Sequence, residues 1–148
     1  PDCVKSWSKN KIVTLRNPNS TRPWQHVLEA LSGYLHLAYQ LDKNQKLNGE
    51  SFNFSNNEIK NFTVLKFING IQKYWKNANW KVYKKSSFYE STLLQLNSNK
   101  AKKLLNWKNK LKLSETIKLV GEWYTSYYES NKKKILTKEQ IIFYMRKK

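Results

Sequence analysis

Residues 16–41 read RNPNSTRPWQHVLEALSGYLHLAYQL, and this stretch decides the fold. Its first eight residues include two Pro, two Asn, one Ser and one Thr, which favour turns, so residues 16–23 are predicted to form a loop. From Trp24 onward apolar residues recur at intervals of three and four, which is typical of an amphipathic helix. The predicted buried face consists of Val27, Leu31, Tyr34, Leu35, Ala38 and Leu41. The stretch therefore predicts a loop that leads directly into a long core helix.

The elements predicted around this stretch are short. Further helices are expected at residues 2–9, 64–75, 98–105 and 114–127, and strands at residues 12–15, 51–55, 80–84 and 93–96. Thr137 and Gln140 frame a capping box that predicts a last helix over residues 137–146, after a solvated basic linker at residues 132–134. The fold class is therefore α+β and helix-dominated. Because such short strands rarely form a sheet alone, we expect them to complete a sheet whose main body lies elsewhere.

The composition indicates one folded domain of a longer protein. With 148 residues, of which 39% are hydrophobic and 14% aromatic, the chain can bury a core. It has no apolar run long enough to span a membrane, and its one cysteine excludes an internal disulfide framework, so a reducing, cytoplasmic setting is the simplest interpretation. The chain starts at Pro1 with neither an initiator Met nor a signal peptide, and we expect it to be a segment of a longer polypeptide.

The formal net charge of +18 permits two interpretations. Clustered basic residues bind the phosphates of nucleic acids, so a basic nucleic-acid-binding module is one of them. However, 25 of the 28 basic residues are Lys, they are spread over every segment, and they accompany 17 Asn and many Ile, Phe and Tyr. This set is what A+T-rich codons encode on any fold, and Lys lacks the planar fork with which Arg recognises phosphate. We therefore favour genome bias as the source of the charge.

The residues needed for most catalytic chemistry are missing. The four Gly are isolated, so no Gly-rich phosphate loop is present, and the scarcity of Asp leaves no Ser/His/Asp set. Cys3 is interpreted as a small packing residue. Tyr39 with Lys43, and Tyr144 with Lys148, match the Y-x-x-x-K spacing of dehydrogenases, but such matches arise by chance in a chain rich in both residue types. We predict neither catalytic residues nor a metal site.

One feature does suggest a ligand. Two of the three arginines, Arg16 and Arg22, lie six residues apart next to the start of a helix, in a chain that otherwise uses Lys. A guanidinium holds an anion through paired hydrogen bonds, and a helix N-terminus favours negative charge. The pair therefore predicts an anion-binding site. Alternatively, both arginines are surface residues or pair with carboxylates such as Glu29.

Residues 16–41 closely resemble the signature of the CDP-glucose 4,6-dehydratases, which are extended short-chain dehydrogenase/reductases. The opening PDCVKSW is also similar to the family, as is the Phe-Asn-Phe of residues 52–54, where the family has Trp-Asn-Phe-Gly-Pro. Residues 89–107, YESTLLQLNSNKAKKLLNW, resemble a family segment of the form His-Glu-Ala…Leu…Leu-Asp…Lys-Ala…Leu-Gly-Trp, and Trp123-Tyr124 resembles a late Trp-Tyr pair. The resemblance covers residues 1–128 in register.

The resemblance implies that the chain is only the C-terminal, substrate-binding part of such an enzyme. Family members bind NAD in an N-terminal Rossmann domain, which also holds the Tyr/Lys pair and the acid–base residues. They oxidise C4 of the sugar, eliminate water across C5–C6 and return the hydride to C6. This chain lacks that domain, so it is expected to bind no cofactor itself and to need the Rossmann domain in cis or in trans. A homodimer could form through the missing domain.

The resemblance also implies a set of substrate-binding residues. Arg22 would contact the diphosphate or the adjoining ribose, and Arg16 would be a second phosphate contact. Thr14 and Leu15 end a strand along which related enzymes lay the nucleotide, largely through the backbone. Glu90 corresponds to the Glu of the segment that closes over the ligand. We expect two further residues of the motif, Trp24 and His26, to pack or to orient the loop.

The sequence departs from the family in the second half of this set. Ser55-Asn56 replaces the Gly-Pro turn, Tyr89 replaces a His, Gln95 and Asn97 replace a basic residue and an Asp, and Asn106 replaces a Gly. The leading hypothesis assigns residues 1–131 to nucleotide-sugar (CDP-glucose) binding and residues 132–148 to a basic linker and C-terminal helix. The alternatives are the nucleic-acid-binding module and a truncated gene product without function.

Overall fold

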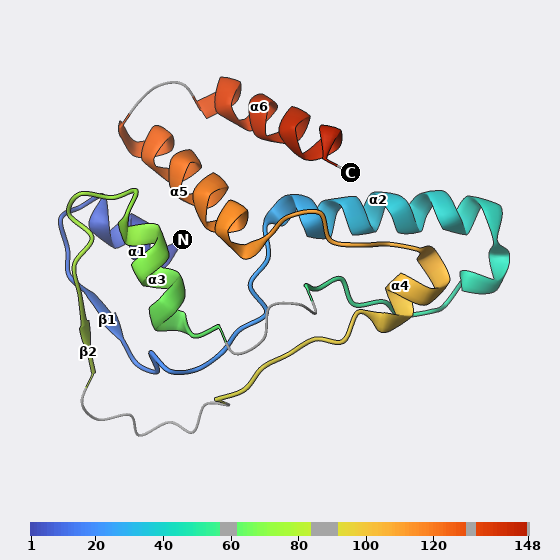
Figure 1. The fold of residues 1–148 in the computed structure, drawn as a ribbon, viewed down its shortest axis with the longest axis horizontal. Helices are drawn as coiled ribbons and strands as arrows, with labels where there is room; N and C mark the ends of the chain where they lie inside the picture. The colour runs from blue at the N-terminus through green and yellow to red at the C-terminus, as the bar shows by residue number, and fades with distance from the viewer. Residues whose placement is uncertain (57–61, 84–91, 130–132, 148) are drawn as a thin grey trace.

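The computed structural model describes residues 1–56, 62–83, 92–129 and 133–147 (Figure 1). The elements are α1 (Asp2–Trp7), β1 (Val13–Leu15), α2 (Val27–Lys43), the short 3-10 helix η1 (Gln45–Leu47), α3 (Val64–Gln72), β2 (Trp80–Val82), α4 (Asn99–Leu105), α5 (Leu113–Glu129) and α6 (Lys133–Arg146). Helices dominate, and the described strands form one small sheet, which agrees with the α+β class expected from the sequence.

The sheet joins two distant parts of the chain. β1 pairs with β2 in parallel, with Val13 opposite Trp80 and Leu15 opposite Val82. Leu15 is buried against α1 and α3, in a cluster that also contains Val4, Trp7, Ile68, Ile71, Trp75 and Ala78. Figure 1 shows α1, α3 and the two strands gathered at one end of the molecule. This first cluster therefore holds the end of β1, where the predicted site begins.

Two smaller clusters lie along α2. Leu47, Phe54, Ala101, Leu105 and Trp107 form the second cluster, against which Leu37, Leu41 and Phe52 pack. The third cluster contains Leu111, Leu119 and Tyr144, with Leu28 packed against it. In Figure 1, α2 runs from the C-terminal end of α6 toward α4. Helix α2 thus connects the two clusters.

The structure corrects the prediction for α2 in two respects. The helix begins at Val27 and not at Trp24, because His26 is the N-cap and its side chain accepts a hydrogen bond from the Leu28 backbone N–H. Apart from Leu41, the predicted buried face is exposed, and α2 instead buries the opposite side, which carries Glu29 and Gly33. A Cβ on Gly33 would lie 2.5 Å from the ring of Phe54, so the second cluster requires glycine there. Periodicity identifies an apolar face but not what covers it.

Two predicted strands are absent from the described residues. Residues 51–55 and 93–96 form no ladder, although Leu93 makes an isolated bridge to Thr21. Phe54 inserts between Gly33 and Trp107, and the Ser55 carbonyl accepts a hydrogen bond from Ser98 Oγ at 2.9 Å. Phe52 and Phe54 therefore alternate because they pack into a core formed by helices, and not because this segment pairs as a strand.

The last helix also starts earlier than predicted. α6 begins at Lys133, so residues 133 and 134 of the predicted linker are helical, whereas residue 132 lies outside the described residues. Thr137 is not an N-cap, because its hydroxyl accepts a hydrogen bond from the indole N–H of Trp123 on α5 at 2.8 Å. A tertiary contact has thus replaced the local capping box. No described helix is long and apolar enough to cross a membrane.

Candidate functional site

The loop of residues 16–23 is held by the N-terminus of α3. The Val64 backbone N–H donates to the Ser20 carbonyl at 2.9 Å, and the Leu65 N–H donates to the Pro18 carbonyl at 2.9 Å. The first N–H groups of a helix have no partner within the helix, so the loop supplies the acceptors they need. Thr63 caps the same helix through its hydroxyl, which accepts from the Lys66 N–H. The loop backbone is consequently fixed relative to the first cluster.

A third segment closes on this loop beside Arg22. The Thr21 N–H donates to the Thr92 carbonyl at 2.8 Å, and Thr21 also makes an isolated bridge to Thr63. Glu90, the other residue predicted to bind substrate, lies outside the described residues. Its near neighbour in sequence, Thr92, therefore contacts the residue that immediately precedes Arg22. The structure thus brings residue 92 next to the loop of residues 16–23, and the role of Glu90 stays a prediction.

Arg22 lies at the centre of this arrangement. Its side chain is half-buried, and Nη1 donates to the Thr21 carbonyl at 2.8 Å, while the Arg22 carbonyl accepts from the Trp24 N–H at 2.8 Å. The bond to Thr21 orients the guanidinium with one of its five N–H donors. A planar fork held in this manner suits a phosphate better than a Lys would.

The other three described candidates lie at the end of β1. Thr14 and Arg16 are exposed, whereas Leu15 is buried in the first cluster and only 6% exposed. The Leu15 carbonyl accepts from the Tyr83 N–H at 2.8 Å. The parallel pairing of Leu15 with Val82 also turns the Leu15 N–H toward β2, so any backbone contact to a ligand at this strand end would come from Thr14 and not from Leu15.

The two aromatic motif residues have structural roles, as expected. Trp24 stacks on Phe67 of α3 with ring centroids 4.0 Å apart, and its indole N–H donates to the Phe62 carbonyl at 2.9 Å. His26 is buried, and burial lowers the pKa of its imidazole, so the ring is neutral near pH 7 and can cap α2 through Nδ1. Both residues set the direction in which the chain leaves the arginine loop.

The alternative that Glu29 pairs with an arginine is not what the structure shows. Glu29 is 1% exposed, and its Oε1 accepts hydrogen bonds from the backbone N–H groups of Lys110 and Leu111 at 2.9 and 2.7 Å. Its Oε2 accepts from the hydroxyl of Tyr144 at 2.8 Å. Sequence reasoning missed this role, because a single Glu in the first turn of a helix gives no signal of its distant partners.

Two departures from the family pattern preserve local structure. Asn106 ends α4 with φ of 55°, a left-handed conformation that Gly adopts freely and Asn adopts more readily than most residues. Asn97 Oδ1 accepts from the Asn99 N–H at 2.8 Å, which an Asp could do equally well. Both replacements therefore permit the local conformations found at the two ends of α4. Tyr89 lies outside the described residues.

The described residues do not fit NAD or a metal ion. Three of the glycines lie under side chains, since a Cβ on Gly33, Gly70 or Gly121 would come within 3 Å of Phe54, Ile117 or Tyr74. They cannot form a loop open to phosphates. No group of three His, Cys, Asp or Glu gathers in the part of the chain that the structure describes. Cys3 packs against the first cluster, and burial raises the pKa of its thiol, which disfavours a nucleophilic thiolate.

The residues of the two Y-x-x-x-K matches lie in different settings. Tyr144 is buried and bonded to Glu29, and Lys148 lies outside the described residues. Lys43 donates to Tyr39 in an exposed pair at the end of α2. The contacts of Tyr144 support a structural role for that residue, and the chance interpretation of the two matches stays a prediction.

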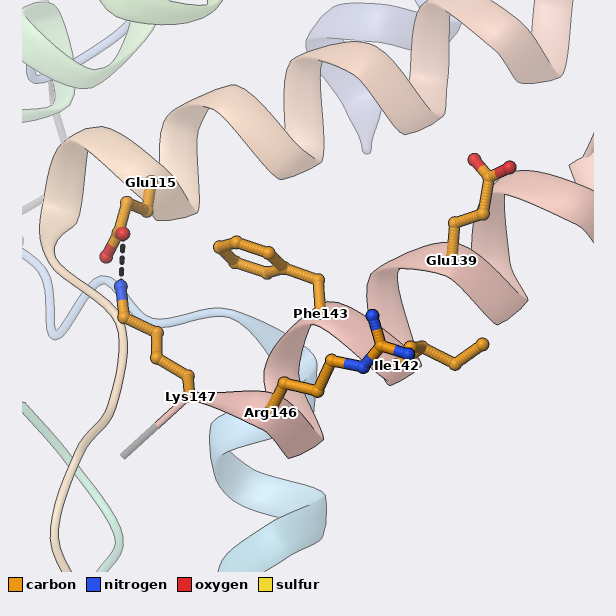
Figure 2. A pocket seen from close by; sticks show the side chains of 6 residues that line it. All are labelled: Glu115, Glu139, Ile142, Phe143, Arg146 and Lys147. Atoms are coloured by element: carbon orange, nitrogen blue, oxygen red, sulfur yellow. Dashed lines mark hydrogen bonds and ion pairs between the residues drawn. The ribbon is translucent and has the colours of Figure 1, made fainter.

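A groove of about 590 Å³ lies away from the arginine loop, between α5 and α6 (Figure 2). Its lining consists of Glu115, Glu139, Ile142, Phe143, Arg146 and Lys147. Lys147 donates to Glu115, and this bond, followed by one from the Lys112 N–H, holds the pKa of the Glu115 carboxyl below its usual value. The groove contains none of the residues predicted to bind substrate.

No protein-family model matches the chain. A curated protein is clearly similar, since the chain is 32% identical over 146 residues to the CDP-glucose 4,6-dehydratase of Salmonella typhimurium. The chain is a partial homologue of CDP-glucose 4,6-dehydratase. The similarity extends over 98% of this chain but only 41% of that relative, so the chain spans about two fifths of the dehydratase. The resemblance to the dehydratases is thereby confirmed, and the coverage is consistent with a C-terminal portion.

Proposed function

We propose that this chain is the nucleotide-sugar-binding portion of a CDP-glucose 4,6-dehydratase. The observation that carries the proposal is the loop of residues 16–23, whose backbone is fixed by α3 and residue 92 while Arg22 is oriented by its bond to the Thr21 carbonyl. In this proposal Arg22 binds the diphosphate or the adjoining ribose. Arg16 is a second phosphate contact, and the backbone of Thr14, next to the buried Leu15, lies along the nucleotide. Glu90 closes the site.

The local charge supports an anionic ligand. Between Lys11 and Gln25 the chain contains no acidic residue, and Glu29, the next one, is turned into the core toward Tyr144. A diphosphate near Arg22 and Arg16 would therefore meet positive charge without a competing carboxylate from this segment. Charge-assisted hydrogen bonds of this kind are stronger than neutral ones.

The dehydration itself would need the rest of the dehydratase. The described residues offer neither a phosphate loop nor a Tyr/Lys pair suited to hydride chemistry. The resemblance assigns NAD to the other portion, supplied in cis or in trans. In this division of labour the chain described here binds and orients the sugar nucleotide and excludes water, whereas the oxidation and elimination occur on the other portion.

The test is CDP-glucose binding by a chimera. The portion of the Salmonella relative that this chain does not cover is placed before Pro1, and affinity is measured by titration calorimetry. Arg22→Ala removes a charged hydrogen-bond partner, worth about 1.5–3 kcal/mol, and should weaken binding roughly ten- to a hundredfold. Trp24 is left intact, and Lys11→Ala serves as the control for loss of one positive charge outside the loop.

Two outcomes would contradict the proposal. If Arg22→Ala and Lys11→Ala bind CDP-glucose equally well, Arg22 is not a ligand contact. If the chimera shows no saturable binding while the unaltered chain binds DNA with a steep dependence on salt, the nucleic-acid alternative is correct.

A further inference from the structure

Two Asn-Gly pairs occur in the chain, and the structure places them in different backbone settings. Asn48-Gly49 lies in the turn that follows η1, whereas Asn69-Gly70 lies inside α3. Both asparagines are exposed. An asparagine before glycine loses its side-chain amide more easily than one before any bulkier residue, because glycine leaves the approach of its own nitrogen unhindered. The two pairs thus share residue types and exposure, and they differ in conformation.

Asn48 and Gly49 occupy the two central positions of a β-turn. The Glu50 backbone N–H donates to the Leu47 carbonyl at 3.1 Å. Asn48 has φ of −65° and ψ of 133°, and Gly49 has φ of 79°, which match a type II turn. Apart from its chain neighbours, no described residue lies within 4 Å of the position of a Cβ on Gly49. The central peptide of this turn can therefore rotate without displacing another segment.

The groups that would react are accessible in the turn and held in the helix. Neither the side-chain amide of Asn48 nor the Gly49 N–H makes a hydrogen bond within the part of the chain that the structure describes. In α3, by contrast, the Gly70 N–H bonds to the carbonyl four residues earlier, and a Cβ on Gly70 would lie 2.9 Å from Ile117 of α5. A reaction at Asn69 would thus require α3 to open.

We propose that Asn48 is a site of spontaneous deamidation. Rotation about ψ of Asn48 brings the Gly49 nitrogen to Cγ of its side chain, and glycine accepts the change in φ that this requires. The nitrogen loses its proton and forms a bond to Cγ, while the bond from Cγ to the side-chain amide breaks and ammonia leaves with that proton. Water then opens the five-membered succinimide at either carbonyl, which gives isoaspartate or aspartate. The proposal does not depend on the binding of CDP-glucose.

The products alter the contact of η1 with its surroundings. Deamidation adds a negative charge two residues before Glu50, whose carboxylate accepts a hydrogen bond from Lys100 of α4. Isoaspartate also adds a methylene to the main chain directly after Leu47, which is buried in the second cluster. A type II turn has no place for this additional atom, so the isoaspartyl form holds Leu47 less firmly.

The experiment compares the two pairs within one molecule. The full chain and the chimera described above are incubated at neutral and at mildly alkaline pH, both folded and in concentrated urea, with thermal melting as the check of folding. Trypsin releases Asn48 in the peptide of residues 47–60 and Asn69 in that of residues 67–73, so mass spectrometry follows each asparagine separately. Asn48→Gln keeps an amide at the turn but lengthens its side chain, and it serves as the control.

In the folded proteins, deamidation at Asn48 should be at least about tenfold faster than at Asn69, because the helix must open locally before it reacts. In urea the two rates should be similar, since both pairs then differ only in neighbouring residues. The rate at Asn48 should rise with pH, because the attacking nitrogen must lose its proton, and Asn48→Gln should abolish the reaction at the turn. Equal rates in the folded proteins would overturn the proposal, as would an Asn48 that stays intact while the urea sample reacts.

The effect on the second cluster has its own measurement. The isoaspartyl form, separated by ion-exchange chromatography, should melt at a lower temperature than Asn48→Asp, which carries the same charge without the additional methylene. Identical melting of the two forms would show that the turn accommodates isoaspartate and would overturn the assigned effect on Leu47.

Discussion

Removing one hydroxyl from Tyr144 tests how α6 is attached to the rest of the protein. The Tyr144 hydroxyl donates to the buried carboxylate of Glu29 at 2.8 Å and lies 2.8 Å from Ser32 Oγ, which in turn accepts from the Trp107 indole N–H at 3.2 Å. Tyr144→Phe keeps the ring in the third cluster but leaves one oxygen of Glu29 buried without this donor. A lost hydrogen bond to a charged group costs about 1.5–3 kcal/mol.

The effect should be visible in thermal and chemical unfolding. For a chain of this size about 1 kcal/mol corresponds to roughly 2–4 °C in Tm, so Tyr144→Phe should lower Tm by about 3–12 °C. Tyr34→Phe is the matched control, because Tyr34 is exposed on α2 and should change stability by less than about 0.5 kcal/mol. Equal stabilities of the two variants would refute the assigned role of the Tyr144 hydroxyl.

The pH dependence provides a second, independent readout. Burial raises the pKa of the Tyr144 phenol, and the neighbouring Glu29 carboxylate also favours the neutral form. A phenol with a raised pKa in the folded state stays neutral while the unfolded chain ionises near pH 10, so the folded state loses stability as pH rises above that value. Tyr144→Phe lacks this titration. The stability gap between the wild type and Tyr144→Phe should therefore narrow above about pH 10, and a constant gap would contradict the reasoning.

Two further predictions follow from the packing of α2. His26→Asn keeps a side-chain cap but removes an imidazole whose pKa is lowered by burial. The wild type should therefore lose stability relative to this variant as pH falls below about 6.5, where the imidazole of the unfolded chain takes up a proton. Urea titrations of both proteins at pH 7 and pH 5 measure this difference, which would be absent if the ring were accessible to solvent. Gly33→Ala would place a Cβ 2.5 Å from the Phe54 ring and should destabilise the chain by about 1–3 kcal/mol through overpacking. Ala38→Gly, on the exposed face of the same helix, should cost no more than about 1 kcal/mol, and a larger loss at Ala38 than at Gly33 would refute the second prediction.

Local sequence signals identified most helices because their causes are local. The apolar spacing of residues 64–75 predicted a helix there, and α3 occupies Val64–Gln72. The turn residues of 16–23 predicted the loop, and its location after a β-branched strand agrees with β1. The predictions of the capping box and of the buried face of α2 were wrong because contacts between distant residues decided them. The indole N–H of Trp123 donates to the Thr137 hydroxyl, and the ring of Phe54 packs against Gly33.

In the candidate site, too, the sequence predicted what depends on local residue types and not what depends on contacts between distant residues. The scarcity of Arg in a Lys-rich chain was enough to predict that Arg16 and Arg22 bind an anion. No local pattern could indicate that α3 donates its first N–H groups to Ser20 and Pro18, or that Thr92 closes beside Arg22. These bonds join residues more than 40 positions apart, and hydrogen bonds at such separation leave no periodic trace in the sequence.

The sequence by itself determined the class of the fold, the order of the helices and the likeness to part of a CDP-glucose 4,6-dehydratase, because each depends on residue types at fixed short spacings. Only the tertiary structure decided which side of α2 is buried. The spacing of apolar residues favoured the other side, and the choice depends instead on the complementary surface offered by Phe54, Leu105 and Trp107. Burial is a property of two surfaces in contact, and a sequence pattern describes only one of them.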